Sequence, residues 1–261
     1  MKKNIIGEMI VKYFESEKEN DSFLTMGIDS IVDPLIDSYL EKPENKGKIG
    51  EYFLRDELRY IIKKGKKGKI LKNIIVDKEK GETSEIDVIF ITQKGIFVIE
   101  YKNYSGSIYG NEKDLYWTEF FSKERKYRFY NPVKQNENHI KWLKRYLKEK
   151  TVFSEEKIRL FNIVVFSDKS KLQNITLVSD AEVVKKSDLE FCIEKIWNEN
   201  EDCFEQEETE MIYKKLGLLT VKDKDEKNKH IERIREEYGS RDEKSSKNKR
   251  KRPVDYSDKY K

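Results

Sequence analysis

Residues 85–102 have the sequence Glu-Ile-Asp-Val-Ile-Phe-Ile-Thr-Gln-Lys-Gly-Ile-Phe-Val-Ile-Glu-Tyr-Lys, and this stretch decides the fold. Two runs rich in β-branched and aromatic residues flank the short segment Gln93-Lys94-Gly95, which predicts two strands joined by a tight turn. Both runs are apolar at successive positions, as in strands that are buried on both faces. We therefore expect an antiparallel hairpin in the middle of a sheet.

Three charged residues interrupt this apolar hairpin, namely Asp87, Glu100 and Lys102. Burying an unpaired charge is costly, so we expect these side chains to pair, to bind an ion or to lie at an open end of the sheet. Side chains alternate along a strand, so Glu100 and Lys102 share a face and lie about 6.5 Å apart. Pairing across the predicted turn, with Asp87 opposite Tyr101, brings Asp87 to the same end. The three charges are therefore predicted to converge.

Such a cluster is suited to phosphodiester hydrolysis. Two carboxylates on one face, Asp87 and Glu100, form a hard oxygen site for Mg²⁺ or Mn²⁺. A metal held there also binds a phosphate oxygen and a water, while Lys102 can orient that water and stabilise developing negative charge. The chain has only two histidines and two cysteines, which argues against a mechanism with several histidines and against a four-ligand zinc site.

The rest of the sequence predicts an α/β domain with a mixed central sheet flanked by helices, over residues 47–200. An N-terminal helical extension (1–46) precedes it, a C-terminal helix lies within 201–219, and a charged, largely disordered basic tail covers 220–261. Within the domain we expect helices over 49–63, 132–148 (with Asn131 as N-cap) and 189–197 (with a capping box from Ser187), and strands over 70–76, 107–109, 115–121 and 161–166.

The amino-acid composition indicates the cellular location that we expect for the protein. Hydrophobic residues make up 36% of the chain and charged residues 40%. The apolar runs are far shorter than the roughly 18 residues that a membrane-spanning helix needs. The basic start is interrupted by Glu8 and does not resemble a signal peptide. We expect a reduced, cytoplasmic protein with no membrane partner, and the excess positive charge of the tail favours phosphate contacts.

The motifs together resemble one family, the nuclease-related domain (NERD), over roughly residues 46–170. Asp87 followed by Glu100-Tyr101-Lys102 is similar to the D…(D/E)-x-K signature of the restriction-endonuclease-like superfamily, although Ile86 stands where the superfamily's name has proline. The other matching pieces, in the family's order, are Gly47-Lys48-Ile49-Gly50-Glu51, Ser84-Glu85-Ile86-Asp87, Gly95 to Asn103, Gly106-Ser107-Ile108-Tyr109-Gly110, Trp117 and Asn131-Pro132-Val133-Lys134-Gln135.

The resemblance implies a restriction-endonuclease-like fold with Asp87, Glu100 and Lys102 in the catalytic positions. It also implies roles for Glu51 on the first helix, as a further metal ligand, and for Gln135, which would orient Lys102, the metal-bound water or the substrate phosphate. We therefore predict a Mg²⁺- or Mn²⁺-dependent nuclease acting on nucleic acid, with DNA favoured over RNA. A catalytically idle nucleic-acid-binding module and a partner-docking scaffold are the alternatives.

Several of these residues also have purely structural interpretations. Glu51 could be a first-turn carboxylate favoured by the helix dipole, and Gln135 a surface amide. We expect His139 to be a hydrogen-bonded helix residue rather than a base. Four aromatic residues could stack on bases, but packing within the sheet is the preferred interpretation: Tyr104, Tyr109, Tyr116 and Trp117.

Overall fold

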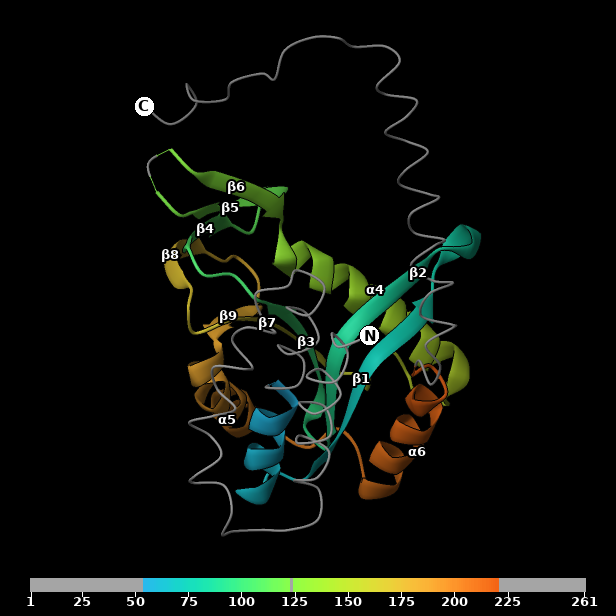
Figure 1. Ribbon diagram of the computed structural model, residues 1–261. Coiled ribbons are helices and arrows are strands. Elements are labelled where there is room, and N and C mark those ends of the chain that lie inside the picture. The colour runs from blue at the N-terminus through green and yellow to red at the C-terminus, as the bar shows by residue number, and fades with distance from the viewer. Residues whose placement is uncertain (1–53, 123, 221–261) are drawn as a thin grey trace, which may run out of the picture. The chain divides into compact units, whose positions relative to one another are not determined.

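The computed structural model describes residues 54–122 and 124–220, which form two mixed sheets flanked by helices (Figure 1). The mixed α/β fold predicted from the sequence is confirmed. The predictions for the helical extension 1–46, for Glu51 and for the tail after Thr220 lie outside the described residues.

The large sheet has five strands in the order β1-β2-β3-β7-β9. β1, β2 and β3 are antiparallel neighbours, and β7 and β9 run parallel to β3. β3 is central and is buried from Gly95 to Glu100, as its continuous apolar run predicts. The bounds are Gly68–Asp77 (β1), Thr83–Thr92 (β2), Gly95–Lys102 (β3), Leu160–Phe166 (β7) and Glu182–Lys185 (β9).

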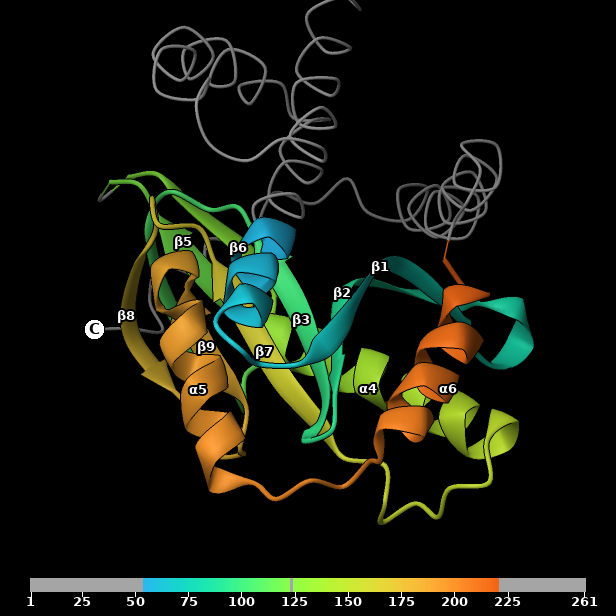
Figure 2. The ribbon, with the colours of Figure 1, turned by 90° about the horizontal axis from the view of Figure 1, so that it is seen from below.

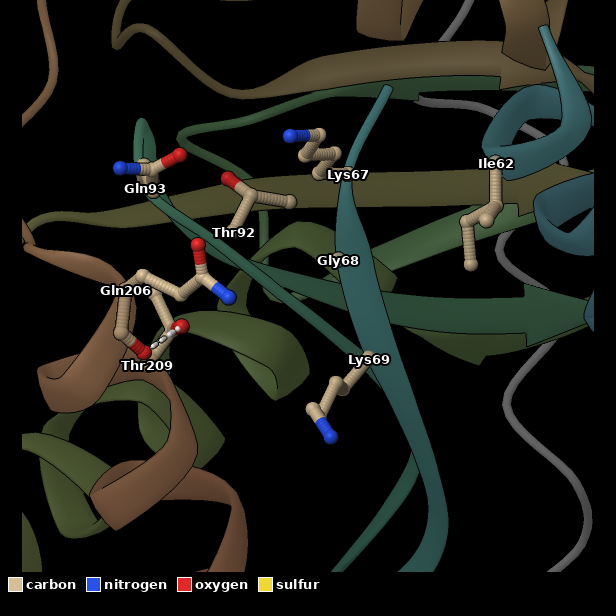
Figure 3. Close-up of a pocket in the computed structure, with 8 residues that line it drawn as sticks. All are labelled: Ile62, Lys67, Gly68, Lys69, Thr92, Gln93, Gln206 and Thr209. Carbon is tan, nitrogen blue, oxygen red and sulfur yellow. Dashed lines mark hydrogen bonds between the residues drawn. The ribbon is translucent and has the colours of Figure 1, made fainter. Parts of the chain in front are cut away.

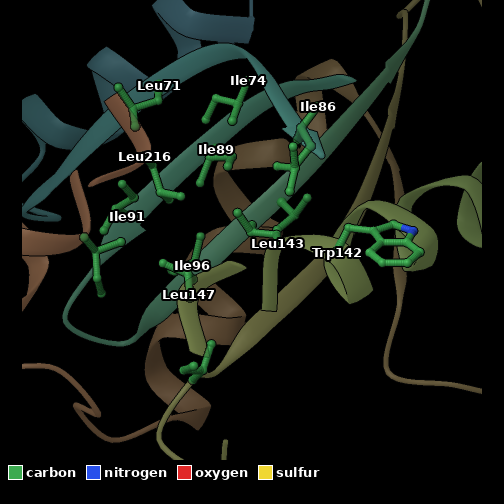
Figure 4. Close-up of a cluster of buried hydrophobic side chains, with 14 of the residues drawn as sticks. Leu71, Ile74, Ile86, Ile89, Ile91, Ile96, Trp142, Leu143, Leu147 and Leu216 are labelled. Atoms are coloured by element: carbon green, nitrogen blue, oxygen red, sulfur yellow. The ribbon is translucent and has the colours of Figure 1, made fainter. Parts of the chain in front are cut away.

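Helices cover both faces of the large sheet (Figure 2). On one face, α4 (Pro132–Lys150) and α6 (Gln206–Gly217) pack against β1, β2 and β3 around Leu143, Leu147 and Leu216 (Figure 4). On the other face lie a helix over residues 54–63 and α5 (Leu189–Glu199). Among the described residues, no helix is both long and apolar enough to span a lipid bilayer.

The small sheet has four strands in the order β6-β5-β4-β8. β4 and β5 were predicted as strands from the sequence. Their separation into a second sheet was not predicted, and neither were the strands β6 and β8. The inner face of the small sheet packs on β7 and on the start of α4, where Trp117 stacks on Phe166 with an interplanar angle of 6°. The bounds are Ser107–Asn111 (β4), Tyr116–Phe120 (β5), Lys126–Tyr130 (β6) and Lys171–Thr176 (β8).

The turn of the central hairpin is shorter than the sequence suggested. It contains only Gln93 and Lys94, because Thr92 already pairs with Gly95. Gly95 has φ 140°, and a Cβ there would lie 2.9 Å from the Arg159 carbonyl oxygen, so this strand start requires glycine. The register differs by one residue from our expectation, and the last β2–β3 pair is Val88 with Ile99. Asp87 therefore lies just beyond the ladder and does not pair with Tyr101.

The helix starts show one prediction confirmed and one wrong. Asn131 caps α4, since its Oδ1 accepts hydrogen bonds from the backbone nitrogens of Val133 (3.0 Å) and Lys134 (3.4 Å). The capping box predicted at Ser187 is absent. Residues Lys186–Asp188 form a 3₁₀ turn that places Asp188 at the N-cap of α5, without a side-chain capping bond.

Candidate active site

The predicted charges lie where β2 and β3 separate. The backbone ladder ends at the Val88–Ile99 pair, and beyond it Asp87 Oδ2 accepts a hydrogen bond of 3.0 Å from the Tyr101 backbone nitrogen. The side chain of Asp87 thus replaces a backbone acceptor at the point where the strands diverge. This bond fixes the carboxylate beside the stretch of β3 that carries Glu100 and Lys102.

β1 contains an irregularity at the same level. Asn73 has φ 52°, a left-handed conformation that asparagine tolerates better than most residues. Leu71 and Ile74 both belong to the cluster under α4, although strict alternation would place them on opposite faces (Figure 4). The left-handed residue between them accounts for this switch, and its neighbours Lys72 and Ile74 pair with Val88 and Ile86, on either side of Asp87.

Glu100 and Lys102 point to the α4 side of the large sheet, as their shared parity predicts. Lys102 Nζ donates a hydrogen bond of 2.7 Å to Glu100 Oε1 and one of 2.9 Å to Gln135 Oε1 of α4. The side chain of Glu100 is only 3% exposed and that of Lys102 is 18% exposed. The structure therefore brings Glu100, Lys102 and Gln135 into one hydrogen-bonded group.

Electrostatics keep Glu100 ionised despite its burial. Burial alone would raise the pKa of this carboxyl group, because it removes water from the charged form. The positive charge of Lys102, together with His139, outweighs this effect and lowers the pKa of Glu100 below its ordinary value. A buried anionic oxygen is therefore present at neutral pH.

His139 also lies next to Glu100. The sequence did not lead us to expect this contact. Its Nδ1 lies 2.6 Å from Ser84 Oγ, and its Nε2 lies 3.4 Å from Glu100 Oε2. Among the described residues, neither Nε2 nor Oε2 has a hydrogen-bond partner. The available signal was helical spacing, since His139 follows Gln135 by four residues and so shares its face of α4.

Two buried polar side chains hold this group in place, each through two hydrogen bonds. Asn136 is fully buried, and its Nδ2 donates to Val98 O of β3 and to Asn162 Oδ1 of β7, both at 2.8 Å. These bonds fix α4 against the central strands. The buried Glu119 accepts hydrogen bonds from the backbone nitrogens of Ser105 (2.9 Å) and Gly106 (2.8 Å), which anchors the loop after Lys102.

The oxygen donors fit a magnesium-like ion. Mg²⁺ is commonly held by one or two carboxylates while it keeps several waters, which matches Asp87 and Glu100. Glu100 Oε2 accepts no hydrogen bond among the described residues and lies 3.4 Å from His139 Nε2, so it is a buried anionic acceptor of the kind that a cation satisfies. Within residues 54–122 and 124–220, no set of three or more His, Cys, Asp or Glu side chains is assembled. The third predicted ligand, Glu51, lies outside this range.

A cavity of about 280 Å³ lies at the Thr92 end of β2, next to the turn of the central hairpin (Figure 3). Lys67, Lys69, Thr92 and Gln206 are among its lining residues. Lys69 is engaged by an ion pair of 2.7 Å with Glu210. The cavity shares no residue with the group around Glu100.

Comparison with known proteins gives two matches. The family model described as the nuclease-related domain matches residues 46–167, a range that contains every predicted site residue. An uncharacterized protein of Bacillus anthracis is 32% identical over 200 residues, which cover 75% of this chain and 87% of that protein. No solved structure matches the chain significantly.

Proposed function

The chain belongs to the nuclease-related domain family, and from this premise we propose that it is a metal-dependent nuclease. It hydrolyses phosphodiester bonds in nucleic acid, with DNA favoured over RNA and Mg²⁺ or Mn²⁺ as the cofactor. The observation that carries the proposal is the Lys102 ammonium group, held between the Glu100 carboxylate (2.7 Å) and the Gln135 amide oxygen (2.9 Å).

Asp87 and Glu100 would hold the metal, with Glu51 as a further ligand. The carboxylate of Asp87 is oriented by the Tyr101 amide, and Glu100 keeps one oxygen without a hydrogen bond among the described residues. When bound, the metal would polarise a phosphate oxygen and lower the pKa of a water molecule.

Lys102 positions the attacking water and supports the negative charge that develops on the phosphate. Its ammonium group has three donors, of which two are used by Glu100 and Gln135, so one remains to point at the substrate. Gln135 keeps the flexible lysine side chain in one orientation. Loss of one such preorganised electrostatic contact typically lowers the rate by ~10²–10³.

Cleavage of circular DNA tests the proposal directly. Circular single-stranded and duplex DNA, with RNA of matched length, are incubated with the protein in Mg²⁺, Mn²⁺ or EDTA. We expect cleavage of DNA that needs the metal and is abolished by Glu100→Gln. The control variant Glu155→Gln changes an exposed carboxylate that is not part of the candidate site, so this variant should cleave DNA at the rate of the parent. Absence of cleavage with either metal would contradict the proposal, and cleavage of RNA alone would contradict the preference for DNA.

One observation favours a second candidate, a nucleic-acid-binding module with an idle site. Lys102 already neutralises Glu100, so the buried carboxylate is stable without a metal. Calorimetric titration with Mg²⁺ and Mn²⁺ separates the two functions. Binding that disappears in Asp87→Ala supports the nuclease, whereas a parent protein that binds nucleic acid but neither metal supports the idle module.

A further inference from the structure

The small sheet has one face packed on the core and one face turned to solvent. Directly paired residues of neighbouring strands lie on the same face, and side chains alternate along each strand. Trp117 and its partner Phe129 are buried, which identifies the inner face. The pairs Tyr109 with Thr118 and Thr118 with Arg128 therefore lie on the outer face.

The outer face carries aromatic side chains in two pairs. Tyr109 of β4 contacts Phe120 of β5 edge to face at 5.2 Å, and Tyr116 of β5 contacts Tyr130 of β6 in the same way at 6.3 Å between ring centroids. Tyr109, Tyr116 and Tyr130 are 37%, 45% and 44% exposed. We preferred packing within the sheet as the interpretation of Tyr109 and Tyr116, and this packing buries only part of their surface. A group of exposed aromatic rings on one face is typical of a binding site.

The charges on this face are positive. Lys126 and Arg128 of β6 and Lys171 of β8 share the outer face with the aromatic pairs. The Arg128 guanidinium lies 5.1 Å from the centre of the Tyr116 ring, in a cation–π contact. Within the described part of the chain none of these three cations forms an ion pair, and the one carboxylate of β5, Glu119, belongs to the inner face. The surface is therefore complementary to a polyanion.

We propose that this outer face binds single-stranded nucleic acid, with bases stacked on the aromatic pairs and phosphates placed near the cations. Exposed sheet faces with aromatic side chains and a positive border bind single strands in this way, because every base has a face that can stack. Bases within a duplex are already stacked and cannot reach the rings. The inference rests on the proposed function and deepens it by naming the form of the substrate.

The chain connects this face to the candidate active site. Tyr130 is the last residue of β6, and Asn131 caps the helix that carries Gln135 (Figure 1). Asn131 Nδ2 also donates to the backbone oxygens of Glu112 (2.9 Å) and Asp114 (2.7 Å), in the connection between β4 and β5. Tyr130 thus precedes Gln135, the residue that holds Lys102, by five positions, with the start of α4 between them.

Binding in EDTA tests the proposal without any cleavage. Fluorescence anisotropy is measured with a labelled single-stranded oligothymidine of about 16 nucleotides and with a duplex of the same length. We expect Tyr109→Ala and Tyr116→Ala each to weaken single-strand binding by roughly 5- to 100-fold. Tyr116→Phe keeps the ring and should bind normally. Tyr60→Ala is the matched control, since Tyr60 is 48% exposed on the helix over residues 54–63, away from this sheet.

The cations give a second, independent measurement. Lys126→Gln and Arg128→Gln should each reduce the slope of log affinity against log salt by about 0.7 for a single strand. Unchanged single-strand binding in the Tyr109→Ala/Tyr116→Ala double variant would overturn the proposal. So would a parent protein that sediments as a dimer and becomes a monomer in that variant, because the face would then bind a second copy.

The outcomes separate this proposal from the nuclease assignment. If the tyrosine variants lose single-strand binding as expected while the parent cuts no DNA with either metal, the surface proposal stands and the nuclease function fails. If the parent cuts circular DNA in a metal-dependent reaction while the tyrosine variants bind single strands normally, the nuclease function stands and the surface proposal fails.

Discussion

Replacing Lys102 with alanine removes the cation that keeps Glu100 ionised in a buried position. The two groups lie 2.7 Å apart, and the side chain of Glu100 is only 3% exposed. Removing one partner of a buried ion pair costs about 3–5 kcal/mol when the other partner stays charged. Glu100 can instead take up a proton, which limits the cost. We therefore expect Lys102→Ala to lower the free energy of unfolding by about 3 kcal/mol near neutral pH. Since native domains are stable by about 5–15 kcal/mol, the variant should still fold.

Urea unfolding in EDTA at about pH 7 and about pH 5 measures this loss and its pH dependence. In the parent, the pKa of Glu100 is lowered on folding, so its stabilising contribution is present above the unfolded-state pKa and is lost as the pH falls through the folded-state pKa. In the variant, burial without the cation raises the pKa of Glu100, so the folded form gains stability relative to the unfolded form on acidification. The difference in stability between parent and variant should therefore shrink toward acidic pH.

Lys69→Ala provides a matched control for Lys102→Ala. Lys69 also lies 2.7 Å from a carboxylate, that of Glu210, but the two side chains are 42% and 39% exposed. An exposed pair is screened by solvent, so Lys69→Ala should lower the free energy of unfolding much less than Lys102→Ala does. Lys69 lowers the pKa of Glu210, so the small difference in stability from the parent should disappear only below the unfolded-state pKa of that carboxyl group, and it should change little between about pH 7 and about pH 5. If Lys102→Ala costs no more than Lys69→Ala near neutral pH, Lys102 does not keep Glu100 charged and our account of the site is wrong.

Three further substitutions test Gln135 and Asn136 of α4 and the packing of the small sheet. Gln135→Ala should lower single-turnover cleavage by about 10–100-fold with little effect on urea unfolding, because the amide holds Lys102 without filling the core. Asn136→Ala should lower the free energy of unfolding by about 1–3 kcal/mol, since the buried Val98 carbonyl loses its side-chain donor; an unchanged urea midpoint would show that α4 is fixed by apolar packing alone. Gly110→Ala places a Cβ against the Trp117 indole and should cost about 1–3 kcal/mol, measured as a lower Tm, whereas Gly217→Ala meets no atom within 4 Å and should not lower it.

Elements whose determinants are local could be predicted from the sequence. The apolar runs on either side of Gln93-Lys94 define β2 and β3, because short runs that are rich in β-branched and aromatic residues and bounded by a turn are typical of buried strands. The Asn131-Pro132 pair defines the start of α4 through a capping bond within the same turn. The shared face of Glu100 and Lys102 follows from alternation alone, and their hydrogen bond confirms it.

Features that depend on distant contacts could not be predicted in this way. β6 is short and mixes aromatic with basic residues, and β8 is short and mostly polar, so neither has a clear strand pattern; they pair along the edges that β5 and β4 offer. The predicted turn contains one residue more than the observed turn. The predicted register therefore pairs Asp87 with Tyr101, whereas in the structure Asp87 lies beyond the last pair of the β2–β3 ladder. The contact between His139 and Ser84 joins residues 55 positions apart, and no local pattern indicates such a pair.

The start of α4 couples the candidate site to both sheets. Asn131 ties the helix to the small sheet, Gln135 binds Lys102 of the large sheet, and Asn136 bonds the central strands β3 and β7. These three residues lie within about one and a half helical turns, so the amide that orients Lys102 stands between the bonds that hold α4 to the small sheet and those that hold it to the large sheet. The ionisation of Glu100 depends in turn on where Lys102 lies. The first turns of this one helix thus carry both the bonds that anchor the small sheet and the amide on which the geometry of the candidate site depends.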